Sequence, residues 1–202
     1  MRASMDNEVF VIGRDPVPSL VRLTEGERLR WTLVSLDGED AELSVEIDLD
    51  GEGADVDIAG LFPALRSGKL KVNVLIRHNA PRCTSRQMFR ILAGGDARVT
   101  FDGLVYVGRD ALRTSARQEC HSILLCDSAV VEARPQLEIY ADDVECSHGA
   151  TTGYLNPDEL FYMRSRGIPE KEARALQMIS FVSPVSERLP EDLKCQIYES
   201  LH

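Results

Sequence analysis

The sequence places a thiol and an imidazole two positions apart in a segment rich in small residues. Cys146 and His148 lie on either side of Ser147, within "DDVECSHGATTG" at 142–153. Residues two apart in an extended segment point to the same side, so both side chains could reach one metal ion or cluster. Thiolate and imidazole suit iron, iron–sulfur clusters or zinc. Spacing alone favours the alternative, which is a buried thiol beside a hydrogen-bonded histidine.

The remaining cysteines give no second motif of this kind. Cys120 and His121 are adjacent, and strand alternation would place them on opposite faces. The five cysteines are odd in number and irregularly spaced, and no CxxC pair occurs. We therefore expect reduced thiols rather than a disulfide framework or a zinc ribbon. A metal-dependent or cysteine-dependent hydrolase is a third reading, although no nucleophile turn or glycine-rich oxyanion loop lies near Cys146.

The segment that precedes this motif reads as a long series of short strands. From Glu27 to about Ala141, alternating and β-branched runs are separated by turn signals such as Asp37-Gly38 and Asp102-Gly103. No helical pattern intervenes, which argues against a doubly wound α/β fold.

A repeat of about 31 residues runs through these strands. "SRQMFRILAGGDARVTF" (85–101) resembles "ARQECHSILLCDSAVVEA" (116–133), and 43–58 is a looser copy. A coil of stacked strands explains this period and also explains the small residues Ala54, Ala97 and Ala129 after turns. The rival is an antiparallel sandwich or jelly roll. The pattern favours the coil slightly.

After residue 153 the period becomes helical. Asn156 is an expected N-cap, Pro157 the first helical residue and Gly167 a C-terminal stop. Two further helices are predicted in "PEKEARALQMISF" and "LPEDLKCQIYESL". We expect an N-terminal arm (1–26), a β-helix core (27–153) and a C-terminal helical domain (154–202). The helices would either cover the open end of the coil or dock a partner.

Composition narrows the classes of partner. The chain of 202 residues has a net charge of −10, which is a poor match for nucleic acid. It contains no apolar run long enough to cross a bilayer, and its N-terminus does not read as a signal peptide. The expectation is a cytoplasmic protein with no nucleic-acid or membrane partner.

Three linked motifs carry a family resemblance. "PQLEIYADDV", "CSHGAT" and "LFYMRSRGI" follow one another in the second half of the chain, which resembles the C-terminal part of SufB/SufD proteins, the scaffold subunits of the SUF iron–sulfur cluster assembly machinery. The resemblance implies a right-handed parallel β-helix with a small C-terminal helical domain. It also implies that the subunits dimerise through their β-helices and bind a small ABC-type ATPase through the C-terminal helices.

The resemblance assigns roles to particular residues. A transient cluster would form at the subunit interface from a cysteine of one subunit and a histidine of the other, with Cys120, Cys146 and His148 as the ligands here. The ATPase would bind the residues of the tail motif, which are Leu160, Phe161, Tyr162, Arg164, Arg166 and Ile168. This chain departs from the family in being short and in having Gly149 where an acidic residue follows the histidine in SufB-type members.

The expected function is therefore a non-enzymatic scaffold for iron–sulfur cluster assembly that acts with a separate ABC-type ATPase. One chain that carries both kinds of ligand favours a homodimer, and a heterodimer with a related scaffold subunit is the other arrangement. A cysteine desulfurase system is a further expected partner. The alternative from a different class is a structural, ATPase-binding subunit that holds no cluster.

Overall fold

The structure, a computed structural model, describes residues 6–36 and 40–202, so the predicted turn at Asp37-Gly38 lies outside the described residues. The strands are β1 (Glu8–Val11), β2 (Leu20–Leu23), β3 (Arg28–Val34), β4 (Ala41–Leu49), β5 (Asp55–Ala64), β6 (Lys69–His78), β7 (Thr84–Ala93), β8 (Arg98–Val107), β9 (Thr114–Leu124), β10 (Val130–Ile139) and β11 (Val144–Tyr154). The helices are α1 (Pro157–Ser165), α2 (Glu170–Ser186) and α3 (Glu191–Ser200).

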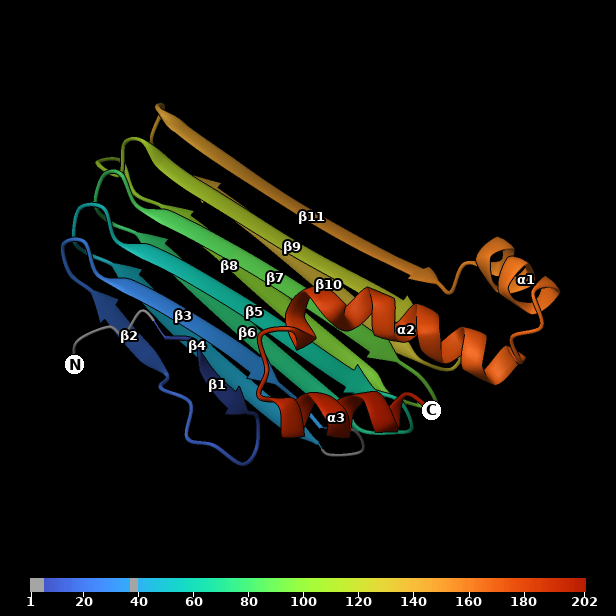
Figure 1. Cartoon of the computed structure of the whole chain (residues 1–202). Helices are drawn as coiled ribbons and strands as arrows, with labels where there is room; N and C mark the ends of the chain where they lie inside the picture. The colour runs from blue at the N-terminus through green and yellow to red at the C-terminus, as the bar shows by residue number, and fades with distance from the viewer. Residues whose placement is uncertain (1–5, 37–39) are drawn as a thin grey trace.

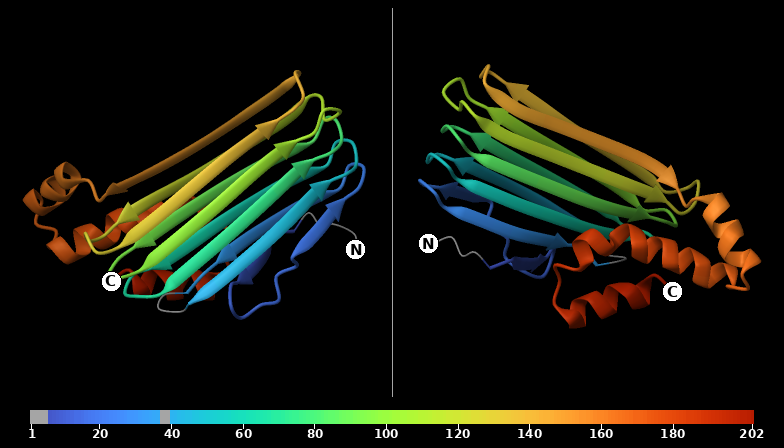
Figure 2. Two further views of the ribbon diagram at one scale, coloured as in Figure 1. Left: turned by 180° about the vertical axis from the view of Figure 1, so that it is seen from behind. Right: turned by 45° about the horizontal axis from the view of Figure 1, so that its top comes forward.

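Successive strands alternate between two parallel sheets (Figures 1 and 2). We call the sheet of order β1-β3-β5-β7-β9-β11 sheet A, and the sheet of order β10-β8-β6-β4-β2 sheet B. Each strand pairs in parallel with the strand two further along the chain, so the backbone winds as a coil of about five turns. The predicted β-helix with C-terminal helices is confirmed, and the antiparallel sandwich is wrong.

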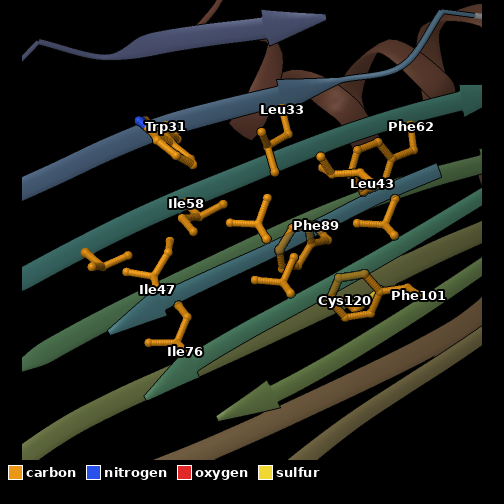
Figure 3. Close-up of a cluster of buried hydrophobic side chains, with 14 of the residues drawn as sticks. Trp31, Leu33, Leu43, Ile47, Ile58, Phe62, Ile76, Phe89, Phe101 and Cys120 are labelled. Atoms are coloured by element: carbon orange, nitrogen blue, oxygen red, sulfur yellow. The ribbon is translucent and has the colours of Figure 1, made fainter. Parts of the chain in front are cut away.

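Alternate residues of every strand fill the bore between the two sheets. The largest buried side chains include Trp31, Phe62, Phe89 and Phe101, and Figure 3 shows them among the aliphatic residues of the same core. The Phe89 and Phe101 rings lie 4.4 Å apart between centroids. Burial of apolar area at about 25 cal/mol per Å² is the main force that holds such a coil together.

The predicted repeat corresponds to the register of sheet A. β7 pairs with β9 at an offset of 31, so that Arg86 lies beside Arg117 and Gln87 beside Gln118. The small residues predicted after turns, Ala54, Ala97 and Ala129, are all buried. A larger side chain at these bends would have to displace the neighbouring coil, which explains why alanine recurs there.

One predicted turn was wrong. Asp102-Gly103 is not a turn but the middle of β8, because Asp102 pairs outward with Arg134 and a Cβ at Gly103 would lie 2.8 Å from the Phe101 ring. β10 likewise continues through Pro135, which lies in the last strand of sheet B, where proline is tolerated. His78 is the buried last residue of β6.

The three-part division of the chain stays a prediction. Within the segment expected to be an arm, β1 pairs with β3 and β2 pairs with β4. The Phe10 ring packs edge-on against Trp31 at 5.0 Å, so these short strands contribute to the first coil.

Helices α2 and α3 cover one face of the coil rather than its end, and α1 lies beside α2. The α1 start follows the sequence prediction, because the Asn156 side chain accepts hydrogen bonds from the backbone N–H groups of Asp158 and Glu159. Gly167 has a φ of 87°, which suits the predicted stop. Helix α2 packs against β5 and β7 on the outer face of sheet A (Figure 1). The helices therefore leave the last coil uncovered, and the expectation that they cover the open end of the coil is wrong there.

Candidate functional site

The last coil of the β-helix is uncovered in the part of the chain that the structure describes. β11 ends sheet A and β10 ends sheet B, and the two views in Figure 2 show β11 at the margin of the molecule. We call these two strands the open edge. Inward positions on β10, such as Ala133 and Leu137, are only half-buried, whereas the equivalent positions on β8 are buried. The open edge therefore exposes interior side chains together with unpaired backbone groups.

Cys146 and His148 both lie on the inward side of β11, as their spacing predicts. Their register partners on β9 are Ala116 and Gln118, which are buried, and paired residues of parallel strands share a face. Cys146 is half-buried and packs against the apolar cluster around Val105, and this burial raises the pKa of its thiol. His148 is exposed. Cys146 and His148 therefore do not form the buried pair of the alternative interpretation.

Cys120 lies one coil deeper. Its side chain is 0% exposed, and burial raises the pKa of its thiol to about 12. It packs in the same core as Phe101 (Figure 3) and its register partner on β11 is Ala150. His148 and Cys120 are thus diagonal positions on adjacent strands, with their Cα atoms about 8 Å apart for ordinary strand spacing and rise.

The three candidate ligands do not form a complete site within one chain. Across residues 6–36 and 40–202, no group of three or more His, Cys, Asp or Glu side chains is arranged to hold a metal ion. The role of these residues as ligands stays a prediction.

Polar side chains inside the bore escaped the sequence reasoning. Gln87 and Gln118 are buried on consecutive strands, and the Gln118 Nε2 donates to the Gln87 Oε1 over 2.9 Å. Ser122 is buried on the same face of β9. The signal was available, because Gln87 and Gln118 stand at the same place in the 31-residue repeat. Two glutamines in one column of an apolar bore can hydrogen-bond each other.

His121 and Cys126 lie outside the bore. His121 faces outward, opposite to Cys120 as predicted, and its Nδ1 shares a hydrogen bond of 2.6 Å with the Thr151 hydroxyl. Cys126 lies in the turn after β9, where the hydrogen bond with Ser128 lowers the pKa of its thiol. Neither residue reaches the inward face that carries Cys146 and His148.

The tail motif forms an exposed surface on α1. The exposed fractions of Phe161 and Tyr162 are 74% and 58%, and the Arg166 guanidinium lies over the Tyr162 ring at 5.2 Å. Arg164 is exposed and pairs with Glu170, whereas Leu160 and Ile168 are half-buried. A groove of about 700 Å³ between β11, α1 and α2 borders this surface and is lined by residues that include Tyr154, Tyr162 and Phe181. Large exposed aromatic side chains of this kind are typical of protein interfaces.

Comparison with known proteins agrees with this geometry. The family model described as "SUF system FeS cluster assembly, SufBD core domain" matches residues 18–181, a range that contains every strand from β2 to β11. The chain belongs to the SufB/SufD family. It is thus part of a family concerned with iron–sulfur cluster assembly in the SUF system, as the three motifs predicted.

Individual relatives support this membership. The chain is 35% identical over 150 residues to the iron–sulfur cluster assembly protein SufD of Escherichia coli, which covers 74% of this chain and 36% of that protein. It is 35% identical over 176 residues to Protein ABCI7, chloroplastic, of Arabidopsis thaliana, which covers 80% of this chain and 37% of that protein. A SufBD family protein of Mycobacterium leprae is 29% identical over 169 residues, covering 80% of this chain and 43% of the relative. The chain thus spans well under half the length of these relatives. Among the described helices, none is both long and apolar enough to cross a membrane.

Proposed function

We propose that this SufB/SufD-family chain is a scaffold subunit on which an iron–sulfur cluster is assembled, with the cluster as transient cargo. The observation that carries the proposal is the open edge, where Cys146 and His148 share the inward face of an uncovered strand and Cys120 lies one coil below. The chain itself catalyses no step in this account. A separate ABC-type ATPase drives assembly, and a cysteine desulfurase system supplies sulfur in the cytoplasm.

The ligands come from two chains. Within one chain the described residues form no metal-holding group, and the open edge leaves an unpaired strand that a second molecule can cover. A homodimer with twofold symmetry is the simplest arrangement, because each chain carries both a cysteine and a histidine. In that dimer, Cys120 of one chain and His148 of the other bind iron, with Cys146 as an auxiliary thiol. A related scaffold subunit in place of the second copy gives the same edge contact.

The aromatic surface of α1 is the docking site for the ATPase. Replacing Phe161, Tyr162 or Arg166 by alanine should weaken the complex by about 1–3 kcal/mol each if they are interface anchors. A matched control is Leu20→Ala, which removes an exposed apolar side chain, 46% exposed, from the other end of the molecule. Calorimetry with the purified ATPase measures the effect. Equal affinity for wild-type protein and all three α1 variants would remove this surface from the account.

Co-purification with an ABC-type ATPase of the SUF system tests the function as a whole. The complex is isolated anaerobically, reconstituted with iron and sulfide, and analysed for bound iron, bound sulfide and a thiolate-to-iron charge-transfer absorption. The proposal expects stoichiometric iron and sulfide that Cys146→Ser reduces. A stable complex that binds neither element points instead to the alternative, a structural subunit that presents the ATPase and holds no cluster.

A further inference from the structure

Three polar side chains form a column that leads from the interior to the open edge. Gln87, Gln118 and His148 are successive register partners on β7, β9 and β11. Gln87 and Gln118 are buried in the bore, and His148 stands on the same inward face one strand further along. Neighbouring strands are about 4.8 Å apart, so the Cα atom of His148 lies about one strand spacing from the Cα atom of Gln118.

The amide nitrogen of Gln118 is held from two sides. It donates to the Gln87 Oε1 over 2.9 Å. It also lies against the backbone of β8 where Gly103 has no side chain, since a Cβ at that position would lie 2.5 Å from the Gln118 Nε2. The other end of the same amide is different, because the buried Gln118 Oε1 has no hydrogen-bond partner among the described residues, and the Gln87 Nε2 of the same pair has none either. A buried carbonyl oxygen without a donor is costly, so its presence beside the open edge calls for a donor.

His148 is the donor that the register places next to this oxygen. The inward positions that surround it on β9 and β11 are Ala116, Cys120, Cys146 and Ala150. None of these four side chains carries an oxygen, so the Gln118 carbonyl is the side-chain acceptor nearest in register to the imidazole.

We propose that Gln118 is a positioning residue for His148. The structure does not contain this hydrogen bond, and a rotation of the His148 side chain brings one ring N–H of the neutral imidazole to the Gln118 Oε1, which then fixes the tautomer and the ring orientation. The second ring nitrogen then presents its lone pair toward the open edge, where it can bind iron. The ligand role of His148 belongs to the proposed function, and this inference rests on it.

Nitrogen-15 NMR of the full chain labelled at histidine tests the inference without any iron. The four histidines are few enough to resolve, and His148→Ala identifies the signal of interest. At about pH 8 we expect one tautomer of His148 to be more populated than it is in a histidine side chain without a hydrogen-bond partner. Gln118→Met, which keeps the bulk and removes the acceptor, should reduce that preference about fivefold, the effect of one ordinary hydrogen bond. Gln118→Glu, which keeps an acceptor oxygen, should preserve it.

Ser122→Ala is the matched control, because it also removes a buried polar group from the inward face of β9 but not from the His148 column. It should leave the tautomer ratio unchanged. In the wild-type protein, a tautomer ratio of His148 equal to that of a histidine side chain without a hydrogen-bond partner would overturn the proposal. An unchanged tautomer ratio in folded Gln118→Met would overturn it too. Iron loading separates the two claims. If His148→Ala takes up iron and sulfide as the wild type does, the ligand role fails, whereas the tautomer ratio alone decides the role of Gln118.

Discussion

The reactivity of the Cys120 thiol tests how the open edge is built. We expect this thiol to react slowly. Burial raises its pKa from 9.0 to about 12, and its side chain is 0% exposed. Thiolate is the reactive form, so at pH 8 this shift alone lowers the reactive fraction about a thousandfold relative to an ordinary cysteine. Steric protection adds to this factor, because alkylating reagent reaches Cys120 only when the last coil opens. Cys195 on α3 is exposed and provides the internal reference.

A timed pulse of iodoacetamide at pH 8, with peptide mass spectrometry for each cysteine, measures these rates. We expect Cys126 to react at least as fast as Cys195, since its pKa is lowered, and Cys120 to react at least about a thousandfold more slowly. In denaturant all five cysteines should react at similar rates, which controls for peptide recovery. Labelling of Cys120 within tenfold of Cys195 in the native protein would refute the placement of Cys120 inside a closed coil. Such labelling would also mean that Cys120 can bind iron without an opening of the edge.

Three further predictions concern the coil and its tail. Burial lowers the pKa of His78 to about 4 from 6.5, so the unfolded chain binds the proton more tightly and the stability present above pH 6.5 is lost as the pH falls toward 4. The loss amounts to about 3 kcal/mol, and urea titrations across this range should show it in the wild type but not in His78→Leu. Gly60→Ala should cost about 1–3 kcal/mol because its methyl group would overlap the Phe89 ring, whereas Gly149→Ala, which meets no atom within 4 Å, should be neutral or slightly stabilising; equal thermal shifts for the two would contradict the packing. Asn156→Ala should cost about 1 kcal/mol by removing the cap of α1, and a melting temperature identical to wild type would show that the cap does not hold the helix.

The coil was predictable because its repeat appears in the local sequence pattern of successive turns. Arg86-Gln87 and Arg117-Gln118 recur at the offset of one full turn, and alternation along each strand marks which residues enter the bore. Individual boundaries were less accessible. Gly103 has the same chemistry in a turn and in a strand, and only the Phe101 and Gln118 side chains that occupy the space beside it explain why the chain passes straight through. A single sequence does not contain that long-range contact in readable form.

The shared face of Cys146 and His148 was predictable, but the environment of the candidate ligands was not. The spacing of Cys146 and His148 put both on one face, and β11 confirms that placement. The family resemblance indicated Cys120, yet its full burial follows from the neighbouring coils that pack around it. The unpartnered carbonyl of Gln118 follows from three strands meeting in register, which a one-dimensional pattern does not specify.

The most direct test of the account mixes two defective chains. Cys120→Ser and His148→Ala proteins are purified separately, allowed to exchange subunits, reconstituted anaerobically with iron and sulfide, and assayed for cluster content by Mössbauer spectroscopy. If Cys120 of one chain and His148 of the other bind iron, each variant alone should lose the cluster. The mixed dimer should recover one of its two sites, because one chain still supplies Cys120 and the other still supplies His148. Full cluster content in both single variants, or no recovery on mixing, would contradict ligation across the open edge.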